Sequence, residues 1–271
     1  MKKIKLFTAV IICTIFLSAL SACGDNNKNT VLKVGATAVP HAVILEQVVP
    51  ILAQEGIELI IVEFDDYILP NLALKDGEID VNYFQHRPFL TRFNTDHNAN
   101  LQPVFGVHFE PLRLYASRFN SLENIPLGAT IAIPDDPSNE ARALQLLEAL
   151  GLIKLTPGLG LTATHTNIIE NPYNLNITPI DAPLLSRTLP DVDFAVINGN
   201  FALQGGVLHL AIEGAAEADD SEAAVSFTNF LVAREGYEDN EAILALIRAI
   251  SSETIKQFIN ERFLGGVVPQ F

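Results

Sequence analysis

The feature that most constrains the fold is an alternation of apolar strands with an amphipathic helix after residue 30. Residues 31–35 and the β-branched run 57–64 have the pattern of strands, and residues 42–53 between them carry apolar side chains at helical spacing. A helix that connects two such strands indicates a parallel sheet with a right-handed crossover. The sequence therefore predicts an α/β fold.

The amino terminus has the three parts of a secretory signal. Three lysines within the first five residues precede an uninterrupted apolar run over residues 6–17, which is short for a membrane span. Small residues then lead to Leu-Ser-Ala-Cys at residues 20–23, which resembles the lipobox of bacterial lipoproteins. The resemblance implies a signal peptide over residues 1–22, a lipid on Cys23 and a polar tether over residues 23–30. We therefore expect a bacterial envelope protein that a lipid anchor holds on the extracytoplasmic side of a membrane.

Cysteine content and net charge exclude several classes of function. Cys13 leaves with the signal and Cys23 carries the lipid, so the mature chain has no disulfide pair and no cysteine for a zinc site. Residues 1–22 contain three of the 17 basic residues and none of the 32 acidic ones, which leaves a net charge of −18. So acidic a surface argues against nucleic acid, because its binding depends on neutralising phosphates. The expected partner is a small molecule or another protein, and no cofactor is expected.

A second series of strands and helices follows a strand predicted at residues 112–118. A strand at 225–233 then runs back, and two amphipathic helices close the chain. The elements between and after these strands are predicted at residues 128–133, 139–150, 182–188, 193–197, 241–250 and 253–263. The mature chain is long enough for its core to split. We therefore expect one lobe from residues 31–113 plus 227–271 and another from residues 114–226.

The most informative stretch for function is Ile-Ala-Ile-Pro-Asp-Asp-Pro-Ser-Asn-Glu-Ala-Arg at residues 131–142. It predicts a buried strand, a polar turn and a helix capped by Ser138 or Asn139. The leucines that follow form an apolar stripe, which leaves Arg142 to one side near the helix start. Unpaired amides, the positive helix end and a guanidinium together favour the binding of a single carboxylate or phosphate group. The alternative is a surface arginine.

Other candidate side chains follow predicted strands of the first half. Tyr67 comes just after strand 57–64, and Phe84 and His86 come at the end of the next strand. Ligand crevices in α/β sheets lie beyond the carboxyl ends of the strands, so these side chains are expected at one rim. The alternatives are a core position for Phe84 and a helix cap for His86. The histidines at 97, 108, 165 and 209 lack metal-ligand spacing, so no metal site is expected.

Ordered motifs along the mature chain carry a resemblance to a known family. They are Val-Glu-Phe-Asp-Asp-Tyr (62–67), Pro-Asn-Leu-Ala-Leu (70–74), Asn-Tyr-Phe-Gln-His (82–86), the stretch 131–144, Gly-Leu-Ile-Lys-Leu (151–155) and Ala-Val-Ile-Asn (195–198). With them the chain resembles the NlpA/MetQ family of methionine-binding lipoproteins of bacterial ABC importers. The resemblance implies a two-lobed periplasmic-binding-protein fold of type II with two strand crossings between the lobes.

The resemblance also implies which residues bind the ligand between the lobes. Arg142 stands where the family holds the ligand carboxylate, and Asn139 lies in the same loop motif. The matching aromatic, histidine and asparagine positions are Tyr67, Phe84, His86, Asn198 and Asn229. Tyr83 is a further candidate, although strand alternation points it away from Phe84. Phe227 and His41 occupy positions that vary within the family, which leaves the identity of the ligand more open than its class.

These observations predict a receptor that captures L-methionine or a close analogue and delivers it to an ABC importer permease with its ATPase. Within that class, a methionine-containing dipeptide or another apolar amino acid stays open, because an aromatic wall does not exclude leucine or isoleucine. A surface lipoprotein or adhesin without a transport role is a second alternative. An esterase or amidase is disfavoured, because the chain has no Gly-x-Ser-x-Gly elbow, no His-Glu-x-x-His motif and no thiol after Cys23. No enzymatic activity is expected.

Overall fold

The computed structural model describes residues 30–219 and 221–271. The predicted signal peptide, the lipidation at Cys23 and nearly all of the predicted tether therefore lie outside the described residues. Within the described ranges, every helix is too short or too polar to cross a bilayer.

The first sheet is mixed and has six strands in the order β13-β4-β12-β3-β1-β2. Its strands are β1 (Thr30–Thr37), β2 (Ile57–Phe64), β3 (Val81–His86), β4 (Leu101–Phe109), β12 (Asn229–Arg234) and β13 (Val268–Pro269). β1 and β3 are parallel, whereas β12 is antiparallel to both β3 and β4.

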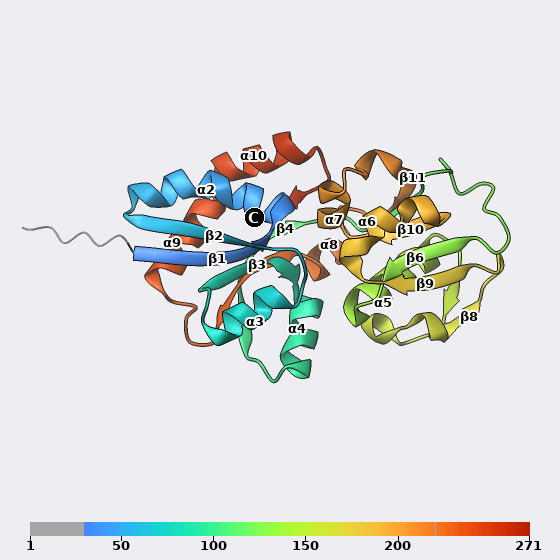
Figure 1. Ribbon diagram of the computed structural model, residues 1–271, viewed down its shortest axis with the longest axis horizontal. Coiled ribbons are helices and arrows are strands. Elements are labelled where there is room, and N and C mark those ends of the chain that lie inside the picture. Colours follow the sequence, from blue (N-terminus) through green and yellow to red (C-terminus); the bar gives the residue numbers. More distant parts are fainter. Residues whose placement is uncertain (1–29, 220) are drawn as a thin grey trace, which may run out of the picture. The chain divides into compact units, whose positions relative to one another are not determined.

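Helices cover both faces of this sheet (Figure 1). α2 (Val43–Gln54), α9 (Glu241–Ile250) and α10 (Glu253–Phe263) pack on one face, and α3 (Leu69–Asp76) and α4 (Arg87–Asp96) on the other. Successive side chains of a strand point to opposite faces, so Leu231 joins the first of these cores and Val232 the second. A short helical turn, η1 (Ala38–Ala42), precedes α2.

The second sheet has five strands in the order β11-β5-β10-β6-β9. They are β5 (Arg113–Tyr115), β6 (Thr130–Pro134), β9 (Asn176–Ile180), β10 (Phe194–Ile197) and β11 (Ala211–Ala216). α5 (Pro137–Ala149) packs against one face, and α6 (Leu185–Thr188) and α7 (Gly199–Gln204) against the other. The remaining elements are β7 (Lys154–Leu155), β8 (Ile168–Glu170), α8 (Glu222–Ser226) and 3₁₀ turns at Gly160–Thr162, His165–Asn167, Ala182–Leu184, Leu189–Asp191 and Leu208–Leu210.

The chain passes between the two sheets twice, so the protein has a two-lobed α/β fold. The first crossing joins β4 to β5 through residues 110–112, and the second joins β11 to β12 through residues 217–228. The strands predicted at residues 112–118 and 225–233 overlap the observed strands β5 and β12 but are longer than them. β5 has only three residues, and β12 begins at Asn229 because residues 222–226 form α8. The lobe boundaries at residues 113/114 and 226/227 stay a prediction.

Candidate functional site

A small cavity lies where the two crossings meet the ends of the strands. Its volume is about 20 Å³, which is room for about one water molecule. The cavity is lined by Tyr67, Phe84, Gln85, His86, Phe89, Glu110, Asn139, Arg142, Asn198, Gly199, Asn200 and Asn229. Most of these residues follow or end a strand, in agreement with the crevice rule for α/β sheets.

The cavity contains seven of the eight side chains that the sequence singled out for ligand binding. Tyr83 is the exception, because it lies on the opposite face of β3 from Phe84, within the core beneath α2. Its hydroxyl is hydrogen-bonded to Nδ1 of His108. Sequence reasoning missed Gln85, Phe89, Glu110, Gly199 and Asn200. The Asn-Gly-Asn turn after β10 was a usable signal for the last two.

Arg142 is buried and held by an ion pair, so the surface-arginine alternative is wrong. Its Nε lies 2.8 Å from Oε1 of Glu217, and its Nη2 lies 2.5 Å from Oε2 of the same carboxylate. Nη2 also donates to the backbone oxygen of Glu110 at 2.9 Å, and the ring of Phe227 lies 4.1 Å from Cζ. Nη1 has no hydrogen-bond partner within residues 30–219 and 221–271, so this end of the guanidinium is a donor for a ligand.

The start of α5 is fixed by Asp136 rather than by the predicted Ser138 or Asn139. Oδ1 of Asp136 accepts from the Asn139 N–H at 3.1 Å, and Oδ2 accepts from Nδ2 of Asn139 at 2.9 Å. Pro137 occupies the first turn, so the cap is Asp136, two residues before Ser138 and three before Asn139. Burial raises the pKa of Asp136, against these hydrogen bonds. Asp136 thereby both caps the helix and orients the Asn139 side chain.

Asn139 in turn connects the two lobes through its side-chain oxygen. Oδ1 accepts from Nε2 of His86 at 3.1 Å and from Nδ2 of Asn198 at 2.9 Å. Burial, followed by the charge of Arg142, lowers the pKa of His86 to about 3, so the imidazole is neutral. Its Nδ1 accepts from the Phe89 N–H at 3.2 Å. His86 therefore caps α4 and lines the cavity at the same time.

Two asparagine atoms in the cavity are buried without a partner among the described residues. Nδ2 of Asn198 is bonded to Asn139, so its oxygen Oδ1 is left as an acceptor. Oδ1 of Asn200 accepts from the Tyr67 hydroxyl at 2.6 Å, so Nδ2 of Asn200 is left as a donor. Buried polar atoms normally find a partner, and both asparagines line the same cavity as Arg142.

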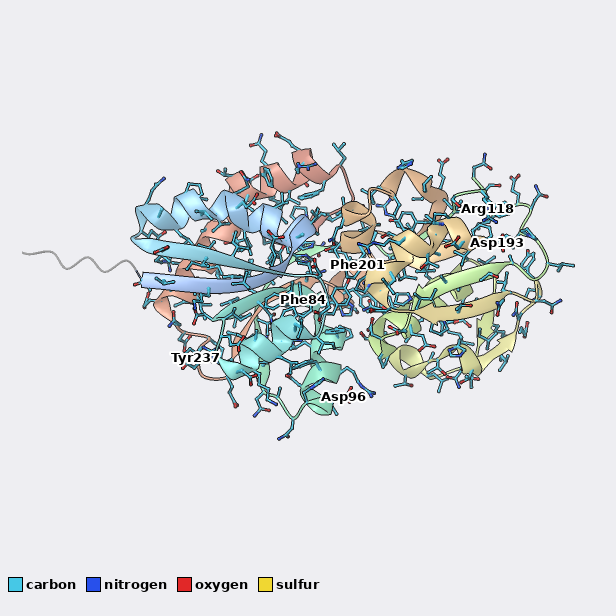
Figure 2. The ribbon with its side chains drawn as sticks, viewed as in Figure 1. Phe84, Asp96, Arg118, Asp193, Phe201 and Tyr237 are labelled. Atoms are coloured by element: carbon cyan, nitrogen blue, oxygen red, sulfur yellow. The ribbon has the colours of Figure 1, made fainter. Side chains whose placement is uncertain are left out.

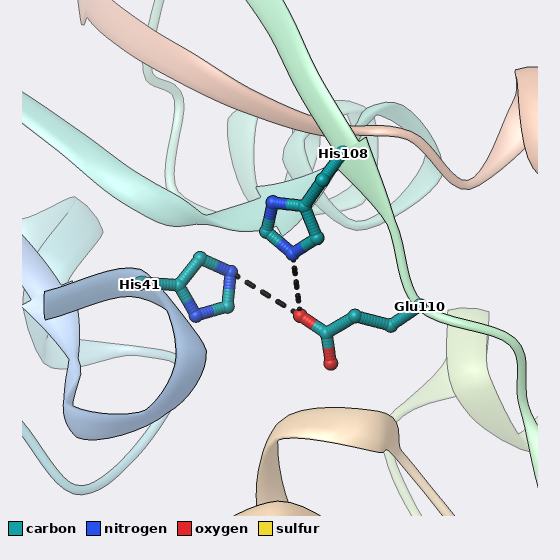
Figure 3. A group of neighbouring side chains, drawn as sticks. All are labelled: His41, His108 and Glu110. Atoms are coloured by element: carbon teal, nitrogen blue, oxygen red, sulfur yellow. Dashed lines mark hydrogen bonds and ion pairs between the residues drawn. The ribbon is translucent and has the colours of Figure 1, made fainter. Parts of the chain in front are cut away.

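A buried cluster of His41, His108 and Glu110 borders the cavity (Figure 3). Nε2 of His108 lies 2.8 Å and Nε2 of His41 lies 3.5 Å from Oε1 of Glu110. All three side chains are possible metal ligands, a grouping that sequence spacing did not reveal. However, two ligands of a tetrahedral zinc, each at about 2.1 Å, lie about 3.4 Å apart, and 2.8 Å is a hydrogen-bond length. The cluster therefore fits a hydrogen-bonded network better than a metal site.

The histidines of this cluster are neutral and each has a second partner. Burial lowers the pKa of His41 and of His108 to about 3. Nδ1 of His41 accepts from Thr37 Oγ1 at 2.7 Å, so its Nε2–H donates to Oδ1 of Asn229 at 3.2 Å. The oxygen of Asn229 thereby has one donor, and its second lone pair and its NH₂ group are what this side chain can offer to a ligand.

An aromatic wall completes the cavity. The ring of Tyr67 lies 5.9 Å from Phe84, 5.6 Å from Phe89 and 5.0 Å from Phe201, measured between centroids. Phe84 comes from β3 of the first sheet, and Phe201 comes from α7, which packs on the second sheet (Figure 2). Such edge and tilted ring contacts stabilise a rigid apolar surface, and they suit a flexible apolar or thioether side chain.

Comparison with known proteins places this geometry among lipoproteins. Residues 32–271 match the family described as NlpA lipoprotein. The chain is 40% identical over 241 residues to the membrane lipoprotein TpN32 of Treponema pallidum, covering 89% of this chain and 88% of the relative. It is 36% identical over 254 residues to the D-methionine-binding lipoprotein MetQ of Escherichia coli, covering 92% of each.

A solved structure with the same fold contains a ligand. The nutrient-binding protein from Burkholderia cenocepacia, bound to methionine, superposes with a TM-score of 0.83 at 36% identity, over 89% of this chain and 100% of that chain.

Proposed function

This chain belongs to the NlpA lipoprotein family, and from that premise we propose that it is the substrate-binding protein of an ABC importer. In this proposal it captures methionine in the cavity between the two sheets and delivers it to the permease and its ATPase. Two relatives support this ligand, the D-methionine-binding lipoprotein MetQ of Escherichia coli and the methionine-bound protein of Burkholderia cenocepacia. The observation in this chain that carries the proposal is the set of unpaired polar atoms beside an aromatic wall.

The unpaired atoms complement the two charged ends of an amino acid. The α-carboxylate accepts from Nη1 of Arg142 and from the NH₂ group of Asn200. The α-ammonium donates to Oδ1 of Asn198. The thioether lies against Tyr67, Phe84 and Phe89, because sulfur makes favourable contacts with aromatic rings. The same wall accepts leucine or isoleucine at lower cost than a charged side chain, so another apolar amino acid or a methionine-containing dipeptide is the alternative ligand.

The first experiment identifies the ligand that the protein carries. The hydrophobic cores on both faces of each sheet lie within residues 31–271, so a soluble chain that starts after Cys23 keeps the whole fold. It is purified without refolding and denatured, and the released small molecules are identified by mass spectrometry. Stoichiometric methionine supports the proposal, whereas another amino acid or a dipeptide keeps the class and changes the ligand.

If nothing is released, the chain is unfolded, refolded and titrated with L- and D-methionine by calorimetry. Absence of heat and of thermal stabilisation with either enantiomer would overturn the receptor proposal and favour a surface lipoprotein without a transport role. An Arg142→Ala variant that keeps its far-ultraviolet spectrum and loses binding separates the receptor from an adhesin.

The membrane anchor is part of the same proposal. We propose that the chain is lipidated on Cys23 and faces the extracytoplasmic side of a membrane, as family membership and the Leu-Ser-Ala-Cys sequence suggest. A Cys23→Ala variant is expected to move from the membrane to the soluble fraction and to lose labelling by an alkyne-bearing palmitate. Retention on the membrane without label would contradict the anchor.

A further inference from the structure

Glu110 lines the cavity and has no part in the ligand contacts of the proposed function. It follows β4 directly, at the start of the first crossing, and is 6% exposed. Among the described residues that line the cavity it is the single carboxylate. A buried carboxylate without a counter-ion is costly, so its position in a binding cavity requires a physical explanation.

The surrounding residues hold the carboxylate in one place. Nε2–H of His108 donates to Oε1 at 2.8 Å, and the Tyr83 hydroxyl bonded to Nδ1 of His108 fixes that tautomer. The Asn200 N–H donates to the same side chain. A Cβ on Gly199 would lie 2.6 Å from Oε2, so only glycine leaves room for this carboxylate. These contacts therefore hold the Glu110 carboxylate in a fixed position.

Among residues 30–219 and 221–271, no cation next to Glu110 is left to balance its charge. The neighbouring histidines are neutral because burial lowers the pKa of His41 and of His108 to about 3. Arg142 is the nearest cation, but its Nε and Nη2 edge is already paired with the carboxylate of Glu217. The described part of the cavity therefore carries an anion in excess whenever Glu110 is ionised.

An amino-acid ligand brings the missing cation. Its ammonium has three N–H donors and needs acceptors. The side-chain acceptors of the lining include Oδ1 of Asn198, which has no partner among the described residues, and the carboxylate of Glu110, which is the charged one. We propose that Glu110 is the counter-ion for the α-ammonium group of the ligand, held in position by the Tyr83–His108 pair. This inference rests on the proposed function and makes the site selective for a free α-amino acid.

The selectivity follows from the geometry of the ligand. An aminoacyl-methionine dipeptide with its terminal carboxylate on Arg142 has an uncharged amide where free methionine has its ammonium. That ligand leaves the buried carboxylate of Glu110 without a counter-ion, which makes its binding less favourable than that of free methionine. Glu110 thus discriminates against dipeptides as well as against ligands that lack an amino group.

The test compares two probes on three variants of the soluble chain. L-methionine and desaminomethionine, which keeps the carboxylate and the thioether and lacks the amino group, are titrated by calorimetry. The variants are Glu110→Gln, which removes the charge with the shape kept, and Gly199→Ala, which displaces Oε2 with the charge kept. Glu140→Gln is the matched control, because Glu140 is also buried and paired with a histidine, His165 at 2.7 Å, and lies outside the cavity lining.

We expect the unaltered chain to prefer methionine strongly over desaminomethionine. Glu110→Gln should weaken methionine binding by at least about 30-fold, because truncating one partner of a buried charge pair removes the interaction with the ammonium. Its affinity for desaminomethionine should stay the same or rise, because the variant removes the negative charge that this ligand leaves without a counter-ion. Gly199→Ala should act in the same direction, and Glu140→Gln should leave both affinities unchanged.

The pH dependence gives a second readout. Burial raises the pKa of Glu110, so methionine affinity should fall as the pH drops through that value, whereas Glu110→Gln should bind with little pH dependence. The histidines and phenols near Glu110 stay neutral over this range, because burial lowers the pKa of the former and raises that of the latter. The groups concerned, together with the cationic Arg142, are His41, His108, Tyr67, Tyr83 and Tyr115.

The outcomes distinguish this inference from the proposed function. Strong methionine binding by Glu110→Gln with the preference over desaminomethionine intact would overturn the counter-ion role and leave the receptor standing. Absence of methionine binding by the unaltered chain would overturn the proposed function and this inference with it. Variants are compared only after their unliganded melting temperatures match that of the parent within about 3 °C, which corresponds to roughly 1 kcal/mol in a chain of this size.

Discussion

At the residue scale, the site combines charges that are already neutralised with groups that have no partner. Arg142 is paired through one edge with Glu217 and through Nη2 with the Glu110 carbonyl. Only Nη1 remains for a ligand among the described contacts. Desolvating an arginine is expensive, so a permanent carboxylate partner makes its burial tolerable before a ligand arrives. The ligand then adds to an ion pair instead of creating one.

This arrangement predicts strong coupling between Arg142 and Glu217. Arg142→Ala should lower the free energy of unfolding by about 3–5 kcal/mol, because it leaves a largely buried carboxylate without its partner. The double variant Arg142→Ala/Glu217→Ala should recover part of that loss. Urea denaturation of all four members of the cycle measures the coupling, and strictly additive effects would show that the two side chains act independently.

Three buried neutral histidines make folding sensitive to acid. Burial lowers the pKa of His41, His86 and His108 to about 3, from 6.5. The unfolded chain therefore binds protons below about pH 6.5 that the folded chain rejects, so the free energy of unfolding should fall as the pH drops from there toward about 3. Each histidine contributes a slope of about 1.4 kcal/mol per pH unit in that window. The pKa values of Glu110 and Asp136 are raised, so these carboxyls offset part of the loss.

Urea midpoints from about pH 7.5 down to pH 4.5 measure this slope. His108→Gln keeps a donor toward Glu110 and removes one titrating ring. Its free energy of unfolding should therefore change less steeply with pH, by about 1.4 kcal/mol per pH unit, which is what one proton contributes. A slope equal to that of the parent chain would mean that His108 is not among the groups that take up protons on unfolding.

At the element scale, the sequence located regular elements better than interrupted ones. Helices α9 and α10 have the predicted bounds, because their apolar periodicity and starts are clear. Strand β4 was missed because Pro103, Gly106 and His108 interrupt its pattern. Glu110 was missed for the same reason, since the residue after an unrecognised strand is not expected at the rim. The Glu217 partner of Arg142 lies 75 residues away and has no local signal.

The rim rule worked where strands were recognised. It expected Tyr67, Phe84 and His86 at one rim, and all three line the cavity, whereas Asn198 came from the family resemblance. Asn229 came from the family resemblance and not from a pattern in the sequence. Strand alternation had already pointed Tyr83 away from Phe84, and the structure places it there. Its contact with His108 depends on the pairing of distant segments, which one sequence does not reveal.

The start of α5 allows a test of how an element orients the site. Asp136→Ala removes the cap and should cost about 1 kcal/mol of stability. It should also weaken methionine binding, because Asn139 loses the acceptor that orients it. Asp136→Asn retains a good cap and should recover most of the stability. Calorimetry and urea denaturation measure the two effects, and unchanged binding by Asp136→Ala would show that Asn139 is oriented by His86 and Asn198 alone.

At the scale of the whole molecule, Arg142 links the two segments that cross between the sheets. Glu110 opens the first crossing and Glu217 opens the second, and both accept from the same guanidinium. A cavity of about 20 Å³ is much smaller than an amino acid of nine heavy atoms. Entry of a ligand therefore requires the lobes to separate, and the crossings are the segments able to act as hinges.

Binding to the folded state should raise thermal stability. At about 100 times the dissociation constant, methionine should add about 2.7 kcal/mol and raise the Tm by roughly 5–10 °C. Methioninol, which keeps the ammonium and lacks the carboxylate, should raise it much less at the same concentration, because it does not engage Arg142. Differential scanning calorimetry measures both shifts. Equal shifts would place the recognition of the carboxylate elsewhere.

Most of the aromatic wall is encoded apart from the polar residues that would hold the amino-acid head group. Tyr67, Phe84 and Phe89 are encoded within a short early segment, whereas Phe201 and the polar residues Glu110, Arg142 and Asn198 are spread over the later part. After gene duplication, substitutions confined to that early segment would let a copy acquire a new cargo without rebuilding recognition of the amino-acid head group. The same separation makes a small library over residues 67–89 a practical route to sensors for other apolar amino acids.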